Sequence, residues 1–165
     1  MKRLVIGVGN VLMQDDGIGP FCVEELRRSE GIHGDLLLID GGTMGLDLMP
    51  YFEDVQKCVI IDALALPKPP GTIEVIESND IKTVLGCKMS VHEIGLTDLL
   101  EALEFLERLP GSLTLVGMVP FCVEFSYGLS EEARKRLPDL VQRVKEIMQT
   151  NMVHSRIFGP IAIQG

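Results

Sequence analysis

The sequence lacks any hydrophobic run long enough to cross a bilayer. Its continuous apolar stretches are short, such as Leu36 to Ile39 and Val59 to Ile61, whereas a membrane-spanning helix needs about 20 apolar residues. Basic residues are also scarce, because 15 Lys and Arg stand against 24 Asp and Glu, for a net charge of −9. The basic residues form no stripe, and phosphate backbones require clustered cations. We therefore expect no nucleic-acid partner and no membrane partner.

Several catalytic motifs are absent as well. The chain has no G-x-S-x-G elbow and no P-loop, which argues against a serine hydrolase and a P-loop nucleotide enzyme. His92 and Glu93 begin an H-E-x-x-H pattern, but Leu96 occupies the second histidine position, so a zincin helix is excluded. The cysteines form no C-x-x-C pair and no export signal precedes them, which predicts reduced, mostly buried thiols in a cytoplasmic protein. These cysteines are Cys22, Cys58, Cys87 and Cys122.

The organisation of the chain is an alternation of strands and helices. At 165 residues with 46% apolar residues, the chain has the size and composition of one globular domain. We assign that domain to residues 1–149 and a C-terminal tail to residues 150–165. Continuous apolar strands separated by helices predict a single three-layer α/β domain, with a mostly parallel five-stranded twisted sheet and helices on both faces. The expected strands are 3–8, 35–40, 57–62, 72–77 and 112–118, and the expected helices are 17–28, 44–52, 95–108 and 130–148.

Two segments carry more specific expectations. Residues 72–77 alternate apolar and charged side chains, which is typical of an edge strand with one wet face. Only a turn separates this segment from the 57–62 strand, so we expect antiparallel pairing. Residues 89–94 are expected to form a loop that leads into the helix at 95–108.

Acidic and imidazole side chains follow the strands where each strand ends. In an open parallel sheet, ligands bind at the carboxyl ends of the strands. Asp16, Asp40, Asp62 and His92 all fall in segments that reach that edge. Carboxylates with a histidine are a donor set for a divalent metal, although aspartates also cap helices and fill turns. Both interpretations remain open from spacing alone.

The first loop also allows a nucleotide-binding interpretation. Residues 7–12, Gly-Val-Gly-Asn-Val-Leu, resemble the dinucleotide fingerprint G-x-G-x-x-G, and Asp40 lies where a ribose-binding acid would lie. Two features oppose it. Leu12 replaces the third glycine, and Asp15 and Asp16 place negative charge where phosphates would dock.

The motifs as a set resemble one family. Residues 7–19 (GVGNVLMQDDGIG) are similar to the N-terminal signature of the hydrogenase maturation proteases, which trim the C-terminal extension of the nickel–iron hydrogenase large subunit. Further blocks follow in the family's order: Asp-Gly-Gly-Thr at 40–43, Ile-Ile-Asp-Ala at 60–63, Pro-Gly-Thr at 70–72, Ser-Val-His-Glu-Ile-Gly-Leu at 90–96 and Leu-Thr-Leu-Val-Gly at 113–117. The resemblance covers roughly residues 3–145.

The resemblance implies roles for individual residues. Metal binding falls on Asp16, Asp62 and His92, where the first of these is often Glu in relatives. Asp40 becomes the candidate for substrate positioning or proton transfer, and Asp16 is the second catalytic candidate. Substrate binding is assigned to the residues around these carboxylates: Asn10, Gly41, Gly42 and Thr43.

The implied function is that of an endopeptidase acting on a nickel-loaded hydrogenase large-subunit precursor. Two mechanisms stay open: a metal of the protease activates the attacking water, or the three ligands reach for the nickel already inserted in the precursor. Family resemblance favours the second, so we expect nickel as the metal. The alternatives are a non-catalytic nickel-sensing or chaperone module on the same site, and a nucleotide-binding α/β protein.

Overall fold

The computed structural model describes residues 1–32, 34–86 and 91–150, and for residues 91–93 only the backbone. Five strands form one sheet in the order β2-β1-β3-β5-β4, with β1 parallel to β2 and β3, and β3 parallel to β5. The strands are β1 (Lys2–Val8), β2 (Leu36–Gly42), β3 (Val55–Ala63), β4 (Ile73–Glu77) and β5 (Ser112–Met118). The helices are η1 (Gln14–Gly17), α1 (Ile18–Arg28), η2 (Gly45–Phe52), α2 (Ser78–Gly86), α3 (Val91–Phe105) and α4 (Glu131–Gln149). The predicted mostly parallel three-layer fold is confirmed.

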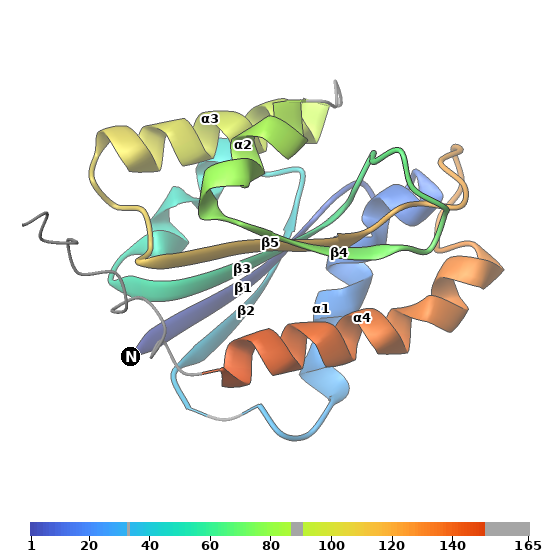
Figure 1. Cartoon of the computed structure of the whole chain (residues 1–165), viewed down its shortest axis with the longest axis horizontal. Coiled ribbons are helices and arrows are strands. Elements are labelled where there is room, and N and C mark those ends of the chain that lie inside the picture. The colour runs from blue at the N-terminus through green and yellow to red at the C-terminus, as the bar shows by residue number, and fades with distance from the viewer. Residues whose placement is uncertain (33, 87–90, 151–165) are drawn as a thin grey trace, which may run out of the picture.

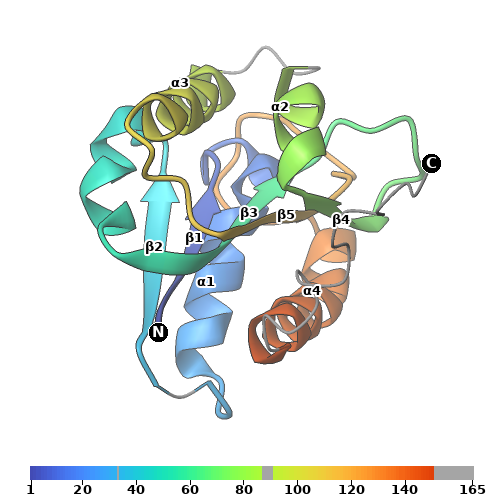
Figure 2. The same cartoon turned by 60° about the vertical axis from the view of Figure 1, so that its left-hand side comes forward.

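Helices cover both faces of this sheet (Figures 1 and 2). Figure 2 shows α2, α3 and η2 on one side of the strands and α1 with α4 on the other. Each side has its own apolar core: Leu4, Ile60 and Leu99 belong to the first, and Val5, Val59 and Leu140 belong to the second. Because β1 and β3 contribute residues to both cores, the stretches 4–6 and 58–61 within them are continuously apolar. Within the described residues, no helix is long and apolar enough to span a membrane.

The strand β4 lies at the edge of the sheet, as its alternating pattern predicts, and it is antiparallel, as the short connection before it predicts, but its neighbour is not the strand that precedes it. β4 pairs with β5, with Val75 opposite Val116. β3 is almost completely buried, so it needs a partner on each side and takes β1 and β5. The half-exposed β4 is left at the periphery.

Two helical segments differ from the prediction. The helix α2 was not predicted, because its apolar stripe is short and only Ile81 and Leu85 are buried. The helix α3 begins at Val91 rather than Gly95, so His92 lies in its first turn and not in a loop. The predicted tail lies almost wholly outside the described residues.

Candidate active site

The glycines of the first loop allow the start of α1 to pack directly on the sheet. A Cβ atom on Gly7 would lie 2.2 Å from the carbonyl oxygen of Gly19, and one on Gly19 would lie 2.4 Å from the carbonyl oxygen of Ile61. Side chains at these positions would force backbone apart. The glycine-rich pattern therefore serves close helix–strand packing, which explains it without a bound pyrophosphate.

This packing places the Asp16 carboxylate at the carboxyl edge of the sheet. Asp16 lies in η1, which contacts β3, and its Oδ2 accepts a hydrogen bond from the Asn10 N–H at 3.0 Å. Asn10 in turn uses its Oδ1 to accept from the Leu12 N–H at 3.0 Å. The side chain of Asn10 thus shapes the loop that presents Asp16.

Asp62 lies at the same edge, near the end of the central strand β3. Its side chain is fully buried, with 0% exposure, and its Oδ1 accepts from the Ala63 N–H at 2.8 Å. Gly117 lies opposite it on β5, where a Cβ atom would come within 2.0 Å of the Asp62 carbonyl oxygen. A buried carboxylate is costly unless partners or a metal compensate its charge, which is consistent with a ligand role.

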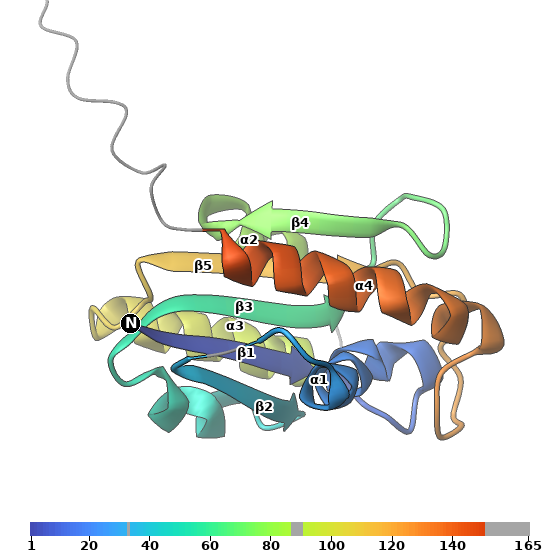
Figure 3. The ribbon, with the colours of Figure 1, turned by 90° about the horizontal axis from the view of Figure 1, so that it is seen from below.

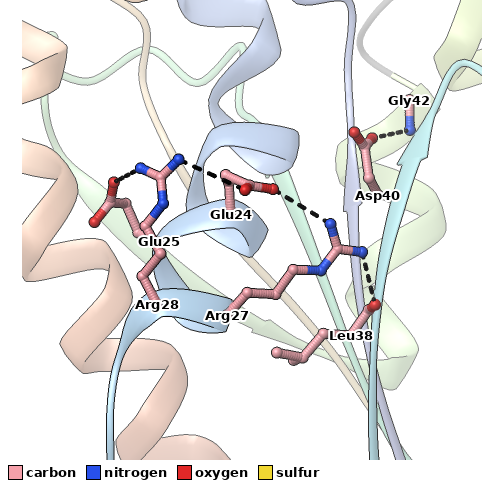
Figure 4. A network of polar contacts seen from close by, with 7 residues as sticks. All are labelled: Glu24, Glu25, Arg27, Arg28, Leu38, Asp40 and Gly42. Carbon is pink, nitrogen blue, oxygen red and sulfur yellow. Dashed lines mark hydrogen bonds and ion pairs between the residues drawn. The ribbon is translucent and has the colours of Figure 1, made fainter.

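Asp40 and its glycine turn form the β2 side of the site. Asp40 pairs with Gly7 across the sheet and is exposed, so its carboxylate faces solvent. Its Oδ1 accepts from the Gly42 N–H at 3.1 Å (Figure 4). Gly41 is buried against Ile6, and Thr43 is exposed.

The edge strand that carries this turn is tied to α1. The guanidinium of Arg27 donates to the Leu38 carbonyl oxygen at 3.0 Å and to Glu24 at 3.3 Å (Figure 4). These contacts attach β2 to the helix that follows the first loop. The strand end that carries Asp40 is therefore fixed relative to the loop that carries Asp16.

The helix α3 packs against the segment that follows the Asp40 turn through a contact between two glycines. A Cβ atom on Gly45 would lie 3.1 Å from the Gly95 Cα, and one on Gly95 would lie 3.1 Å from the Gly45 Cα. The segment after the Asp-Gly-Gly-Thr turn therefore touches the backbone of α3 one turn beyond His92. The side chain of His92 lies outside the described residues. Among the side chains that are described, no three His, Cys, Asp or Glu residues form a group that could hold a metal.

Asp15 has a role that its sequence position alone did not indicate. Its side chain is 1% exposed, and its carboxylate accepts hydrogen bonds from the backbone N–H groups of Phe121, Cys122 and Ser130, and from the Ser130 hydroxyl. All four distances are between 2.8 and 3.0 Å. Asp15 therefore anchors the segment after β5 to the first loop, while the adjacent Asp16 faces the site.

The described cysteines offer no activated nucleophile. Burial raises the pKa of the Cys22 and Cys58 thiols above the ordinary value. Burial and then the charges of Glu124, Asp15 and Glu132 also raise the pKa of Cys122. Because the thiolate is the nucleophilic form, none of these three thiols is activated for attack.

Comparison with known proteins identifies the family. The family model for hydrogenase maturation protease matches residues 20–147. The hydrogenase 2 maturation protease of Escherichia coli is 31% identical, with 94% of this chain and 95% of that protein aligned. The HupD hydrogenase expression/formation protein of Rhodobacter capsulatus is 35% identical, and the match covers 77% of this chain and 60% of that protein. The chain belongs to the hydrogenase maturation protease family.

A solved structure in this family has the same fold. The hydrogenase maturating endopeptidase HybD from E. coli superposes with a TM-score of 0.82 at 32% identity, covering 87% of this protease and 90% of HybD. The predicted family and fold, and the assignment as a hydrogenase maturation endopeptidase, are thereby confirmed. The nucleotide-binding alternative has no support in these comparisons. The individual metal, catalytic and substrate roles predicted above remain predictions.

Proposed function

We propose that this protease removes the C-terminal extension of a hydrogenase large-subunit precursor after nickel has been inserted. The observation that carries the proposal is the convergence of Asp16, Asp40 and Asp62 at the carboxyl edge of one sheet, in a member of the hydrogenase maturation protease family. An acidic, partly buried edge suits a substrate that brings its own cation. Cys22 and Cys58 are free buried thiols, which fits action in the reducing cytoplasm.

In this proposal, Asp16, Asp62 and His92 bind the nickel carried by the precursor. Two carboxylates and an imidazole are hard and borderline donors that suit a divalent first-row ion. They are fewer than a closed coordination sphere, so the precursor's own ligands can stay on the metal. Nickel is then a recognition mark that reports a completed site.

The cleavage step is assigned to the carboxylates at the open side of the edge. Asp40 is exposed beside Gly41 and Gly42, so an extended peptide can approach its carboxylate without displacing side chains. Asp40 positions the scissile segment or accepts the proton of the attacking water, and Asp16 is the second candidate for the proton. Asn10 and Thr43 belong to the loops that carry Asp16 and Asp40, and the side-chain NH₂ of Asn10 and the hydroxyl of Thr43 can donate to peptide carbonyls.

The test is a mass measurement on the precursor. Purified protease is incubated with nickel-loaded precursor and, separately, with nickel-free precursor. We expect the nickel-loaded protein alone to lose a defined C-terminal peptide, and Asp62→Asn and His92→Ala to abolish that loss. Asp47→Asn, which changes an exposed carboxylate on η2, is the matched control and should cleave normally.

The outcomes separate the alternatives. A precursor of unchanged mass in a tight complex with the protease would favour the nickel-sensing or chaperone module. Equal cleavage of nickel-loaded and nickel-free precursor would contradict nickel-dependent recognition and leave only the endopeptidase activity.

A further inference from the structure

A group of exposed apolar side chains lies beside the candidate active site. It consists of Leu12, Val123, Phe125 and Tyr127, here called the aromatic loop surface. Phe125 is 83% exposed and Tyr127 is 72% exposed. Single exposed apolar residues are ordinary, but neighbouring exposed aromatics mark binding surfaces.

Backbone pairing brings these side chains together from two distant segments. The Ser126 N–H donates to the Leu12 carbonyl oxygen at 2.9 Å, and the Gln14 N–H donates to the Ser126 carbonyl oxygen at 3.1 Å. Figures 1 and 3 show the orange segment after β5 beside the blue first loop. The rings of Tyr127 and of Phe21 on α1 also form an edge-to-face contact, with ring centroids 5.9 Å apart.

The buried carboxylate of Asp15 fixes the backbone on both sides of the aromatic loop surface. The four hydrogen bonds that the Asp15 carboxylate accepts fix residues 121, 122 and 130, which bracket the exposed aromatics. A segment ordered before binding loses little conformational entropy when a partner arrives. An exposed apolar loop that is fixed in this way is suited to binding a rigid protein surface.

The position of the surface identifies its occupant. Leu12 belongs to the same loop as Asn10 and Asp16, so the surface is continuous with the edge where the peptide is proposed to bind. Exposed carboxylates, Glu124 and Glu132, accompany the aromatics. An apolar patch with acidic neighbours complements an apolar patch rimmed by Lys or Arg.

We propose that the aromatic loop surface docks the folded body of the hydrogenase large-subunit precursor, through an apolar patch with a basic rim, while the C-terminal extension enters the site. This inference rests on the proposed function and deepens it. Docking supplies affinity for the whole precursor, and the carboxylate edge supplies the reaction. The two contributions are separable in KM and kcat.

The test compares two equally exposed phenylalanines. Phe125→Ser and Tyr127→Ser remove the surface, and Phe105→Ser is the matched control, because Phe105 is 87% exposed at the C-terminal end of α3, the end opposite His92. Cleavage of nickel-loaded precursor is followed at varied precursor concentration. We expect Phe125→Ser to raise KM about tenfold with kcat unchanged, as for an aromatic anchor, and Phe105→Ser to change neither.

The results distinguish this inference from the proposed function. If the wild-type protease leaves the precursor intact, the proposed function fails. If the wild type cleaves and both Phe125→Ser and Tyr127→Ser keep the wild-type KM, the docking surface is overturned while the activity stands. A fall in kcat at constant KM, or an equal rise in KM for Phe105→Ser, would also overturn it.

Discussion

Asp15 and Ser130 are 115 positions apart in the sequence, yet the carboxylate of Asp15 accepts both the backbone N–H and the hydroxyl of Ser130 at 2.8 Å. Ser130 is also the N-cap of α4, where its Oγ accepts from the Ala133 N–H at 3.2 Å. The negative charge of Asp15 therefore lies at a helix N-terminus, where the helix dipole favours it. One buried carboxylate joins the first loop, the segment after β5 and the last helix.

The first prediction separates the two neighbouring aspartates. Asp15→Asn turns an NH₂ group toward backbone N–H donors, so buried donors lose their acceptor. We expect the free energy of unfolding to fall by about 3 kcal/mol. Asp16→Asn should lower it by less than about 1 kcal/mol, because Asp16 accepts one described N–H in a partly exposed loop. Urea unfolding of both variants measures the difference, and equal losses would contradict the anchoring role.

The second prediction concerns the glycines of the first signature. Gly19→Ala places a methyl group 2.4 Å from the carbonyl oxygens of Val8 and Ile61, so α1 must move away from the sheet. We expect a loss of about 3 kcal/mol in the free energy of unfolding. Gly86→Ala is the control, since its Cβ would meet no atom of the described residues within 4 Å, and it should leave stability unchanged or slightly raised. Thermal unfolding of the two variants should therefore give opposite shifts or a shift in Gly19→Ala alone.

The third prediction is a fall in stability at alkaline pH. Burial raises the pKa of Cys58 above the ordinary 9.0, so above pH 9.0 the unfolded chain releases a proton that the folded chain retains. The free energy of unfolding therefore falls with rising pH, by about 1.4 kcal/mol per pH unit for this thiol. Below that pH both states are protonated and the thiol contributes no slope.

Replacing the thiol tests this slope. In Cys58→Ala, the free energy of unfolding should fall less steeply between pH 9 and 10.5, because the contribution of this thiol to the slope is lost. Val59→Ala truncates an adjacent buried side chain and should keep the wild-type slope. Cys22 and the buried Lys57, whose pKa burial lowers, contribute equally to all three proteins and cancel. Parallel declines in wild type and Cys58→Ala would remove Cys58 as the cause.

The fourth prediction assigns Asp40 to cleavage rather than to metal binding. Its carboxylate is exposed on β2, which is separated from β3 by β1, whereas Asp62 is buried on β3 itself. Asp40→Asn should reduce precursor cleavage about a hundredfold, the scale of losing a general base, and leave nickel affinity unchanged. Nickel titration and cleavage rates are measured on the same preparation. Equal loss of both would make Asp40 a ligand, and loss of neither would make it a turn residue.

Most of the fold could be predicted from the sequence because the signals are strong and local. The continuous apolar runs of β1 and β3 reflect burial on both faces, and alternation correctly placed β4 at an edge. The partner of β4 could not be predicted from the short connection, because the need of β3 for two neighbours decides it. Gly95 was predicted to begin the helix, but it lies inside α3, where its backbone packs closely against Gly45.

The positions of the candidate site residues could be predicted from the sequence, but the different roles of neighbouring carboxylates could not. Strand ends identify Asp40 and Asp62, because a parallel sheet aligns its carboxyl ends. The sequence does not indicate whether Asp15 or Asp16 is buried, because that depends on how the segment 121–130 packs over the first loop. The hydrogen bonds of Asp15 form only across that long separation.

The contact between Gly45 and Gly95 has a consequence for engineering. A Cβ atom at either glycine would lie 3.1 Å from the Cα atom of the other, which is tighter than ordinary van der Waals contact, so the turn that follows Asp40 or the first turns of α3 would have to give by a few tenths of an ångström. A library intended to retarget the protease to another precursor should hold both glycines constant. Variation can then be concentrated at positions 123, 125 and 127, where exposed side chains can be exchanged without moving the reacting groups.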